Sequence, residues 1–154
     1  MPVQKLREFL DSQGIKYVAI QHSMAYSAQE VAASVHIRGK ELAKTVMVKI
    51  DGKMVMAVLP ASRNIDLDLL KAVAEAGQVQ LAAEAEFKDM FPGCAVGAMP
   101  PFGNLYGIDV FAEESLAEDK EISFNAGLHS ELVRLAYKDF ERLVKPKVGR
   151  FSLK

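Results

Sequence analysis

The chain has little cysteine, no excess of one charge and no long hydrophobic run among its 154 residues. Its one cysteine, Cys94, excludes an intrachain disulfide and weakly favours a reducing compartment. A formal net charge of −1 excludes a broad basic surface, so any contact with nucleic acid must be local. No apolar run is long enough to cross a bilayer, and the first residues lack a signal-peptide core. We therefore expect a soluble, cytoplasmic protein.

Common catalytic and cofactor motifs are also missing. The sequence has no phosphate-binding loop, no dinucleotide fingerprint and no nucleophile elbow. Its histidines, cysteine and carboxylates do not cluster at metal-ligand spacing, so no metal site is predicted. Cys94 lies between a turn and an apolar run, which is typical of a buried, inert thiol.

Half of the residues are hydrophobic, which suits a single domain over residues 1–154. The patterns predict helices near 3–13, 27–35, 66–76, 84–91 and 130–144, and strands near 17–21, 44–50, 53–60, 79–81, 94–96, 107–112 and 121–124. Several connections are too short for parallel crossovers, so we predict a mixed α/β (α+β) fold, with a partly closed sheet or barrel among helices. The basic tail, 145–154, is expected to be loosely held.

Lys44 opens the clearest local pattern. Two apolar runs, 44–50 and 53–60, flank Asp51-Gly52, which predicts a β-hairpin with a type I′ turn. Side chains alternate along a strand, so Lys44 shares a face with apolar residues. An ammonium group there is costly unless it holds an anion or a polarised carbonyl. Alternatively, the long stem of Lys44 carries its charge to water at the strand end.

A glycine- and proline-rich loop is the second pattern. It consists of Gly97, Ala98, Met99, Pro100, Pro101, Phe102 and Gly103. Its prolines remove two backbone donors and stiffen the chain, while its glycines allow close backbone approach to a ligand. Phe102 could then form a pocket wall. The alternative is a rigid surface turn whose Phe102 fills the core.

The third pattern is the turn Asn125-Ala126-Gly127, followed by His129 and a predicted helix start at Ser130. A helix N-terminus presents N–H groups to polar ligands, and His129 could hydrogen-bond a substrate or move a proton. A surface histidine without a role is the alternative. His22 ends a predicted strand and could line a pocket, although His22 and Tyr26 could equally be a packed turn.

Cations recur at helical spacing in the predicted last helix, at Arg134, Lys138, Arg142 and Lys145. An apolar stripe of Leu132, Ala136, Phe140 and Leu143 lies opposite. The cations could touch a phosphate backbone, or they could form an ordinary solvated face.

The order and spacing of these patterns resemble those of the YbaK and prolyl-tRNA-synthetase-associated domain family of aminoacyl-tRNA editing domains. The resemblance rests on the segment from His22 to Glu30, on Ala43-Lys44-Thr45, on the loop from Gly97 to Gly103, and on Asn125-Ala126-Gly127 with His129. It covers nearly the whole chain. It implies a mixed α/β fold and hydrolysis of the ester between a wrong, small amino acid and its tRNA, without a metal or organic cofactor.

The resemblance also implies roles for residues. The lysine that matches Lys44 is the key functional residue of the family, and the loop that matches Gly97 to Pro101 grips the aminoacyl end. Thr45 departs from members that clear alanine, which often have asparagine there. The candidate substrate-binding residues are His22, Tyr26, Thr45, Gly97, Ala98, Met99, Pro100, Pro101, Phe102, Gly103, Asn125, Gly127 and His129. The expected partners are the acceptor end of aminoacyl-tRNA, most simply tRNA for proline, and a prolyl-tRNA synthetase.

Three functions fit the sequence. The first is a trans-acting deacylase of mischarged tRNA. The second is a noncatalytic module that binds an amino acid or an aminoacyl end for regulation. The third is a deacylase of small esters unrelated to tRNA.

Overall fold

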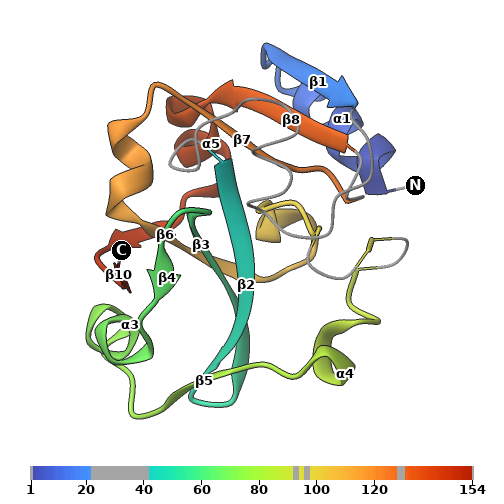
Figure 1. Cartoon of the computed structure of the whole chain (residues 1–154). Coiled ribbons are helices and arrows are strands. Elements are labelled where there is room, and N and C mark those ends of the chain that lie inside the picture. The colour runs from blue at the N-terminus through green and yellow to red at the C-terminus, as the bar shows by residue number, and fades with distance from the viewer. Residues whose placement is uncertain (1, 22–41, 92–93, 96–97, 128–130, 154) are drawn as a thin grey trace.

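The computed structural model describes residues 2–21, 42–91, 94–95, 98–127 and 131–153. Within them an eight-stranded sheet has the order β1-β8-β7-β2-β3-β6-β9, with β5 paired to β2, and β10 pairs with β4 (Figure 1). The strands are β1 (Tyr17–Gln21), β2 (Leu42–Ile50), β3 (Lys53–Pro60), β4 (Asn64–Ile65), β5 (Val79–Leu81), β6 (Asp109–Glu113), β7 (Glu121–Asn125), β8 (Glu131–Ala136), β9 (Lys147–Gly149) and β10 (Ser152–Leu153).

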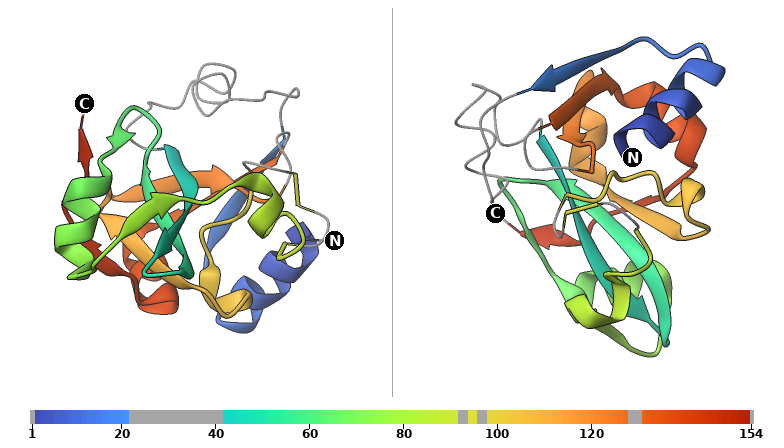
Figure 2. Two further views of the ribbon diagram at one scale, coloured as in Figure 1. Left: turned by 90° about the horizontal axis from the view of Figure 1, so that it is seen from below. Right: turned by 90° about the vertical axis from the view of Figure 1, so that its right-hand side faces the viewer.

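Helices pack beside this sheet. They are α1 (Pro2–Ser12), α3 (Leu67–Ala74), α4 (Glu84–Phe87) and α5 (Tyr137–Val144), with short 3₁₀ turns at Gly103–Leu105 and Glu114–Glu118. The α1 and α3 helices lie at opposite ends of the molecule (Figure 2). Among the described residues, no helix is long and apolar enough to cross a membrane.

The central hairpin is confirmed. β2 and β3 pair antiparallel from Ala43–Pro60 to Ile50–Lys53. Asp51 and Gly52 both have positive φ, at 51° and 84°, as a type I′ turn requires. The Asp51 carboxylate also accepts hydrogen bonds from the backbone N–H groups of Gly77 and Gln78, at 3.0 and 2.8 Å. These bonds fasten the turn to the chain that enters β5.

The sheet is mixed, as predicted. β2 pairs in parallel with β7, and β3 pairs in parallel with β6. The pairs β1–β8, β8–β7 and β2–β3 are antiparallel. Each face of the sheet buries a separate apolar cluster. The larger contains Leu6 and Leu10 of α1, Met47 of β2 and Phe140 of α5. The smaller contains Val48, Val55, Leu59, Leu70, Phe111 and Phe151, with Val46 and Ile50 packed against it.

The predicted last helix is wrong over its first half. Residues Glu131–Ala136 form β8, paired antiparallel to both β1 and β7, and only Tyr137–Val144 is helical. The sequence of this segment satisfies both periods, since Val133 and Leu135 also alternate toward the core as a strand requires. Pairing with two neighbouring strands decides in favour of the strand. Ser130 lies outside the described residues.

The predicted loose tail is also wrong. Lys147–Gly149 pairs with β6, and Ser152–Leu153 pairs with β4. Phe151 is fully buried, and its N–H donates a hydrogen bond to the buried Glu113 carboxylate. The prediction rested on the basic residues of the tail and did not account for the burial of Phe151.

Other elements also differ from the prediction. α3 ends at Ala74, where Glu75 adopts a left-handed conformation, rather than near Gly77. α4 ends at Phe87, well before Phe91. Cys94 and Ala95 lie in no strand, and Val96 is outside the described residues.

Replacing Phe151 tests how firmly the tail is held. Phe151→Ala should lower the free energy of unfolding by about 3–5 kcal/mol, because it empties a fully buried aromatic site. Urea denaturation measures this loss. Leu153→Ala is the matched control, since Leu153 is 47% exposed, and should cost much less. Equal, small losses in both variants would mean that the tail is not part of the core.

Candidate functional site

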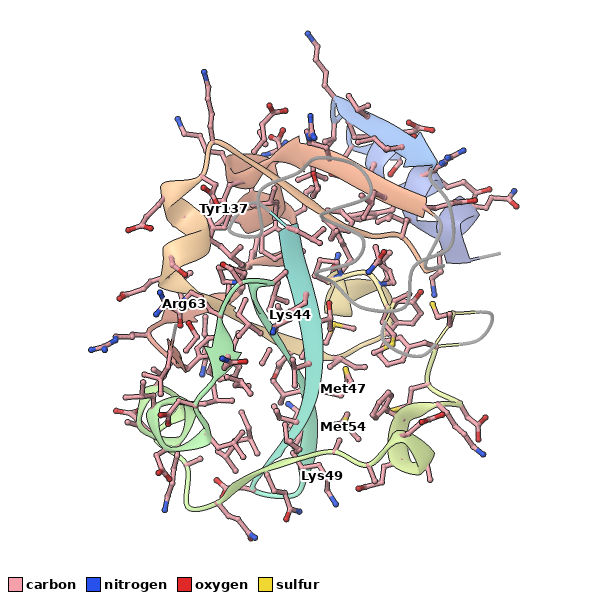
Figure 3. The ribbon with its side chains drawn as sticks, viewed as in Figure 1. Lys44, Met47, Lys49, Met54, Arg63 and Tyr137 are labelled. Carbon is pink, nitrogen blue, oxygen red and sulfur yellow. The ribbon has the colours of Figure 1, made fainter. Side chains whose placement is uncertain are left out.

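Lys44 lies near the start of β2, half-buried, opposite Leu59 of β3. Val46, Val48 and Ile50, which share its face by alternation, pack in the smaller apolar cluster. Met47 lies on the other face of β2 and packs in the larger cluster. Figure 3 shows Lys44 and Met47 on opposite sides of β2. The predicted apolar setting of Lys44 is therefore present.

Burial lowers the pKa of the Lys44 ammonium group, and no charged neighbour contributes to the shift. Among the described residues, no carboxylate lies within salt-bridge distance of it. Lys49 on the opposite face contrasts with it, because its ammonium group is 2.8 Å from a Glu86 carboxylate oxygen. Lys44 is thus a partly desolvated cation with no carboxylate partner in the described part of the chain, which makes it a candidate ligand contact.

The end of β7 lies beside Lys44. Leu42 pairs with Ser123 and Ala43 with Phe124 in the parallel register. Extending this register by one residue places Asn125 level with Lys44, on the same face of the sheet. The Asn125 side-chain oxygen Oδ1 is buried, and within the described ranges it has no hydrogen-bond partner. Since buried polar atoms are normally paired, this oxygen is a candidate ligand contact.

The glycine- and proline-rich loop is bonded to the turn that follows β7. The N–H of Gly127 donates to the Ala98 carbonyl, and the N–H of Ala95 donates to the Gly127 carbonyl, both at 2.8 Å. Gly127 has a φ of 108°, which favours glycine. The second and third sequence patterns therefore meet directly, one strand away from Lys44.

The loop itself is firmly packed. Ala98, Met99, Pro100 and Pro101 are buried. At Gly103 an added Cβ would lie 2.4 Å from the carbonyl oxygen of Ile108, so only glycine fits there. These contacts fix the loop backbone in place next to the turn.

Phe102 belongs to the core. It is fully buried, and its ring centroid lies 6.2 Å from that of Phe9, 5.4 Å from that of Phe124 and 5.8 Å from that of Phe140. Its side chain therefore fills the core, as the alternative interpretation of the loop held, and it anchors the loop from beneath.

Thr45 is the one described candidate of this group, and it lies away from the Lys44 face. Thr45 is half-buried and, by alternation, lies on the opposite face from Lys44. His22, Tyr26, Gly97 and His129 lie outside the described residues.

The four predicted cations do not lie along one helix. Arg134 lies on β8, while Lys138 and Arg142 lie on α5 and Lys145 follows its end. Arg142 pairs with Asp139 at 3.5 Å.

Ser123 was not among the residues predicted from the sequence. Its side chain is buried on the Lys44 face, and its hydroxyl accepts a hydrogen bond from Arg134 Nε at 3.2 Å. A signal was present, because Glu121-Ile122-Ser123-Phe124-Asn125 alternates strictly between polar and apolar residues. That alternation places the polar residues on one face of the strand.

A groove of about 550 Å³ elsewhere is not part of this site. Ile50, Lys53, Phe111 and Lys147 are among its lining residues. Ile50 is six residues from Lys44 along β2, or about 20 Å in an extended strand. The groove therefore belongs to the other end of the hairpin.

Comparison with known proteins defines the class of this fold and site. Residues 22–143 match the family model of the aminoacyl-tRNA editing domain. The chain is 31% identical over 156 residues to the multifunctional Ser/Thr-tRNA deacylase ProXp-y of Escherichia coli (strain K12), across 96% of this chain and 91% of that protein. The protein belongs to the aminoacyl-tRNA editing domain family. The comparisons confirm the predicted resemblance and support the predicted deacylase function.

More distant relatives and solved structures are also similar to this chain. The proline--tRNA ligase of Bacillus mycoides (strain KBAB4) is 28% identical over 89 residues, which are 58% of this chain and 16% of the ligase. The crystal structure of hypothetical protein APE2540 has a TM-score of 0.86 at 20% identity, covering 97% of this chain and 99% of that one. The structure of a candidate trans-editing enzyme for prolyl tRNA synthetase gives 0.83 at 18% identity, covering 99% and 98%. These two structures show the same fold.

Removing the charge of Lys44 should stabilise the protein. Lys44→Met keeps an apolar stem but removes the half-buried ammonium group. Tm at neutral pH should therefore rise by roughly 2–4 °C. This is the shift that a gain of about 1 kcal/mol in the free energy of unfolding produces in a chain of this size. Thermal unfolding measures this rise. The folded-state pKa is lowered, so the gain should shrink as pH rises through the lysine range. The exposed Lys88→Met is the control; an equal rise there would contradict the account.

Proposed function

We propose that this protein hydrolyses the ester bond between a small, wrongly attached amino acid and its tRNA, acting in trans. The observation that carries the proposal is the half-buried cation Lys44, which has no described carboxylate within salt-bridge distance and lies level with the end of β7, where the turn is bonded to the loop. The membership of the chain in the editing-domain family supplies the substrate class.

The reaction needs charge stabilisation more than a protein nucleophile. The oxygen of a water molecule bonds to the ester carbonyl carbon, and negative charge develops on the carbonyl oxygen. The bond from that carbon to the ribose oxygen then breaks, and the ribose oxygen takes a proton that the attacking water gives up, which leaves free amino acid and tRNA. A fixed cation in a partly desolvated setting stabilises the developing oxyanion more strongly than water does. Lys44 has the charge and the burial for this role.

The loop and the turn can form the rim of the site at the end of β7. Their mutual hydrogen bonds and their buried prolines hold their backbone in place. The Asn125 Oδ1 atom, which has no hydrogen-bond partner among the described residues, can accept a hydrogen bond from the substrate's ammonium group or from a side-chain hydroxyl. Such a contact favours serine or threonine, the amino acids in the name of the Escherichia coli relative.

The same relatives support a proposal for the biological setting. Proline--tRNA ligases carry a segment similar to this chain, which supports tRNA for proline as the substrate and a prolyl-tRNA synthetase as a partner. The net charge of −1 agrees with modest affinity for tRNA alone, to which a synthetase partner would add. We place this activity in the cytoplasm, where tRNA is charged.

A deacylation panel tests the proposal. The purified protein should release free amino acid from tRNA for proline charged with serine, threonine or alanine, and Lys44→Ala should lower the rate constant about 10²–10³-fold because the oxyanion loses its cation. Lys49→Ala is the control on the same strand, on the opposite face and in a salt bridge. It should leave the rate nearly unchanged.

Two outcomes of the panel would contradict the proposal. Tight binding of aminoacyl-tRNA without turnover would favour a noncatalytic binding module. Hydrolysis of small esters that excess tRNA does not inhibit would favour an esterase unrelated to tRNA.

The pH dependence gives an independent test. Burial lowers the pKa of Lys44, so the enzymatic rate, corrected for spontaneous hydrolysis, should fall as pH rises, starting below the range of an ordinary lysine. An active Lys44→Arg variant should keep its rate to higher pH, because guanidinium stays charged. An enzymatic rate that rises through this range would instead indicate that neutral Lys44 acts as a base.

A further inference from the structure

Arg134 is a second cation on the face that carries Lys44. Ser123 of β7 pairs with Leu42 of β2 on one side and with Arg134 of β8 on the other. Directly paired residues of neighbouring strands point to the same face, and Leu42 shares its face with Lys44 by alternation. The register therefore places Arg134 and Lys44 on one surface, although 90 residues separate them in the sequence.

The side chain of Arg134 extends toward Lys44. Its Nε donates a hydrogen bond to the Ser123 hydroxyl at 3.2 Å, and Ser123 is only 1% exposed. Since β7 lies between β8 and β2, this bond directs the guanidinium group across β7 in the direction of Lys44. Arg134 itself is half-buried, so its orientation is held by packing as well as by this bond.

The outer edge of this guanidinium group is open to an anion. Within the described part of the chain, no carboxylate lies within salt-bridge distance of Arg134. Two other arginines are engaged differently: Arg142 pairs with Asp139, and Arg63 donates to the Ser152 hydroxyl and carbonyl. Among the described residues this guanidinium group is bonded through Nε, and its two terminal nitrogens match two oxygens of a phosphate.

The separation of the two cations suits one end of a nucleic acid. Arg134 and Lys44 are two strands apart, at about 4.8 Å per strand, and two residues apart along the strands, at about 3.3 Å each. Their Cα atoms are thus about 12 Å apart, and the Arg134 side chain shortens this distance. A ribose ester at Lys44 and a backbone phosphate of the same terminal nucleotides can lie across such a span.

We propose that Arg134 binds a backbone phosphate at the 3′ end of the tRNA and so holds the aminoacyl ester at Lys44. Arg134 is then a positioning residue, oriented by Ser123. The inference rests on the proposed function, because its ligand is the same tRNA. It also separates Arg134 from the other three predicted cations, Lys138, Arg142 and Lys145, which lie on or after α5.

Binding and catalysis are measured separately to test this inference. The probe for binding is an uncharged RNA minihelix with the acceptor stem and CCA end of tRNA for proline, titrated at several salt concentrations. Arg134→Gln should weaken its binding about tenfold or more and reduce the slope of log K against log salt by about one phosphate contact. With charged tRNA, KM should rise more than kcat falls.

Three further variants make the test specific. Arg134→Lys keeps the charge and should recover part of the binding. Ser123→Ala keeps every charge but releases the guanidinium group, so it should weaken binding by less than Arg134→Gln and leave the salt slope near that of the unmodified protein. Lys138→Gln makes the same charge change as Arg134→Gln at an exposed position on α5, and should have little effect. Thermal unfolding verifies that each variant is folded.

The outcomes separate this inference from the proposed function. Unchanged minihelix affinity and salt slope in folded Arg134→Gln would overturn the inference, as would an equal loss in Lys138→Gln. Weaker binding with an unchanged salt slope would also overturn it, because it would indicate a structural role. Arg134-dependent binding without deacylation by the unmodified protein would support the inference and overturn only the proposed catalytic function.

Discussion

The short parallel pairing of β2 with β7 joins the two halves of the sheet, and the candidate site depends on it. Its register pairs, Leu42–Ser123 and Ala43–Phe124, connect the β1-β8-β7 half to the β2-β3-β6-β9 half. It places Lys44 level with Asn125, and it places the loop bonded to Gly127 one strand away. Because a shift by one residue would turn every side chain of a strand to the other face, this register determines which groups meet.

The site places a costly charge on a firmly packed sheet. Burial of the Lys44 ammonium group opposes folding, and the apolar clusters on both faces of the sheet supply the stability that offsets it. The same burial strengthens its interaction with negative charge that develops on a bound ester. A domain without a nucleophile motif can therefore act on an activated ester, since the ester bond to tRNA needs water, orientation and a stabilised oxyanion.

Local patterns in the sequence predicted local structure well. The Asp51-Gly52 hairpin, the helix that begins after Asp66 and the strand Tyr17–Gln21 all depend on neighbouring residues, and each is present. Segments whose state depends on distant partners were predicted poorly. Glu131–Ala136 fits both helical and strand periods, and its pairing with β1 and β7 decides between them. The tail is ordered by Phe151, whose burial requires partners far away in the sequence. Likewise Lys44 was evident from its own strand, whereas the Ser123–Arg134 contact emerged only from the register.

The central claim is that Lys44 stabilises negative charge at the ester carbonyl, and differential binding of two adenosine analogues tests it most directly. One analogue carries an anionic tetrahedral phosphonate in place of the ester, and the other carries a neutral amide of the same amino acid. Calorimetry should show that the unmodified protein binds the phosphonate more tightly than the amide, and that Lys44→Ala loses this preference while still binding the amide. An equal preference for the phosphonate in both proteins would contradict the account.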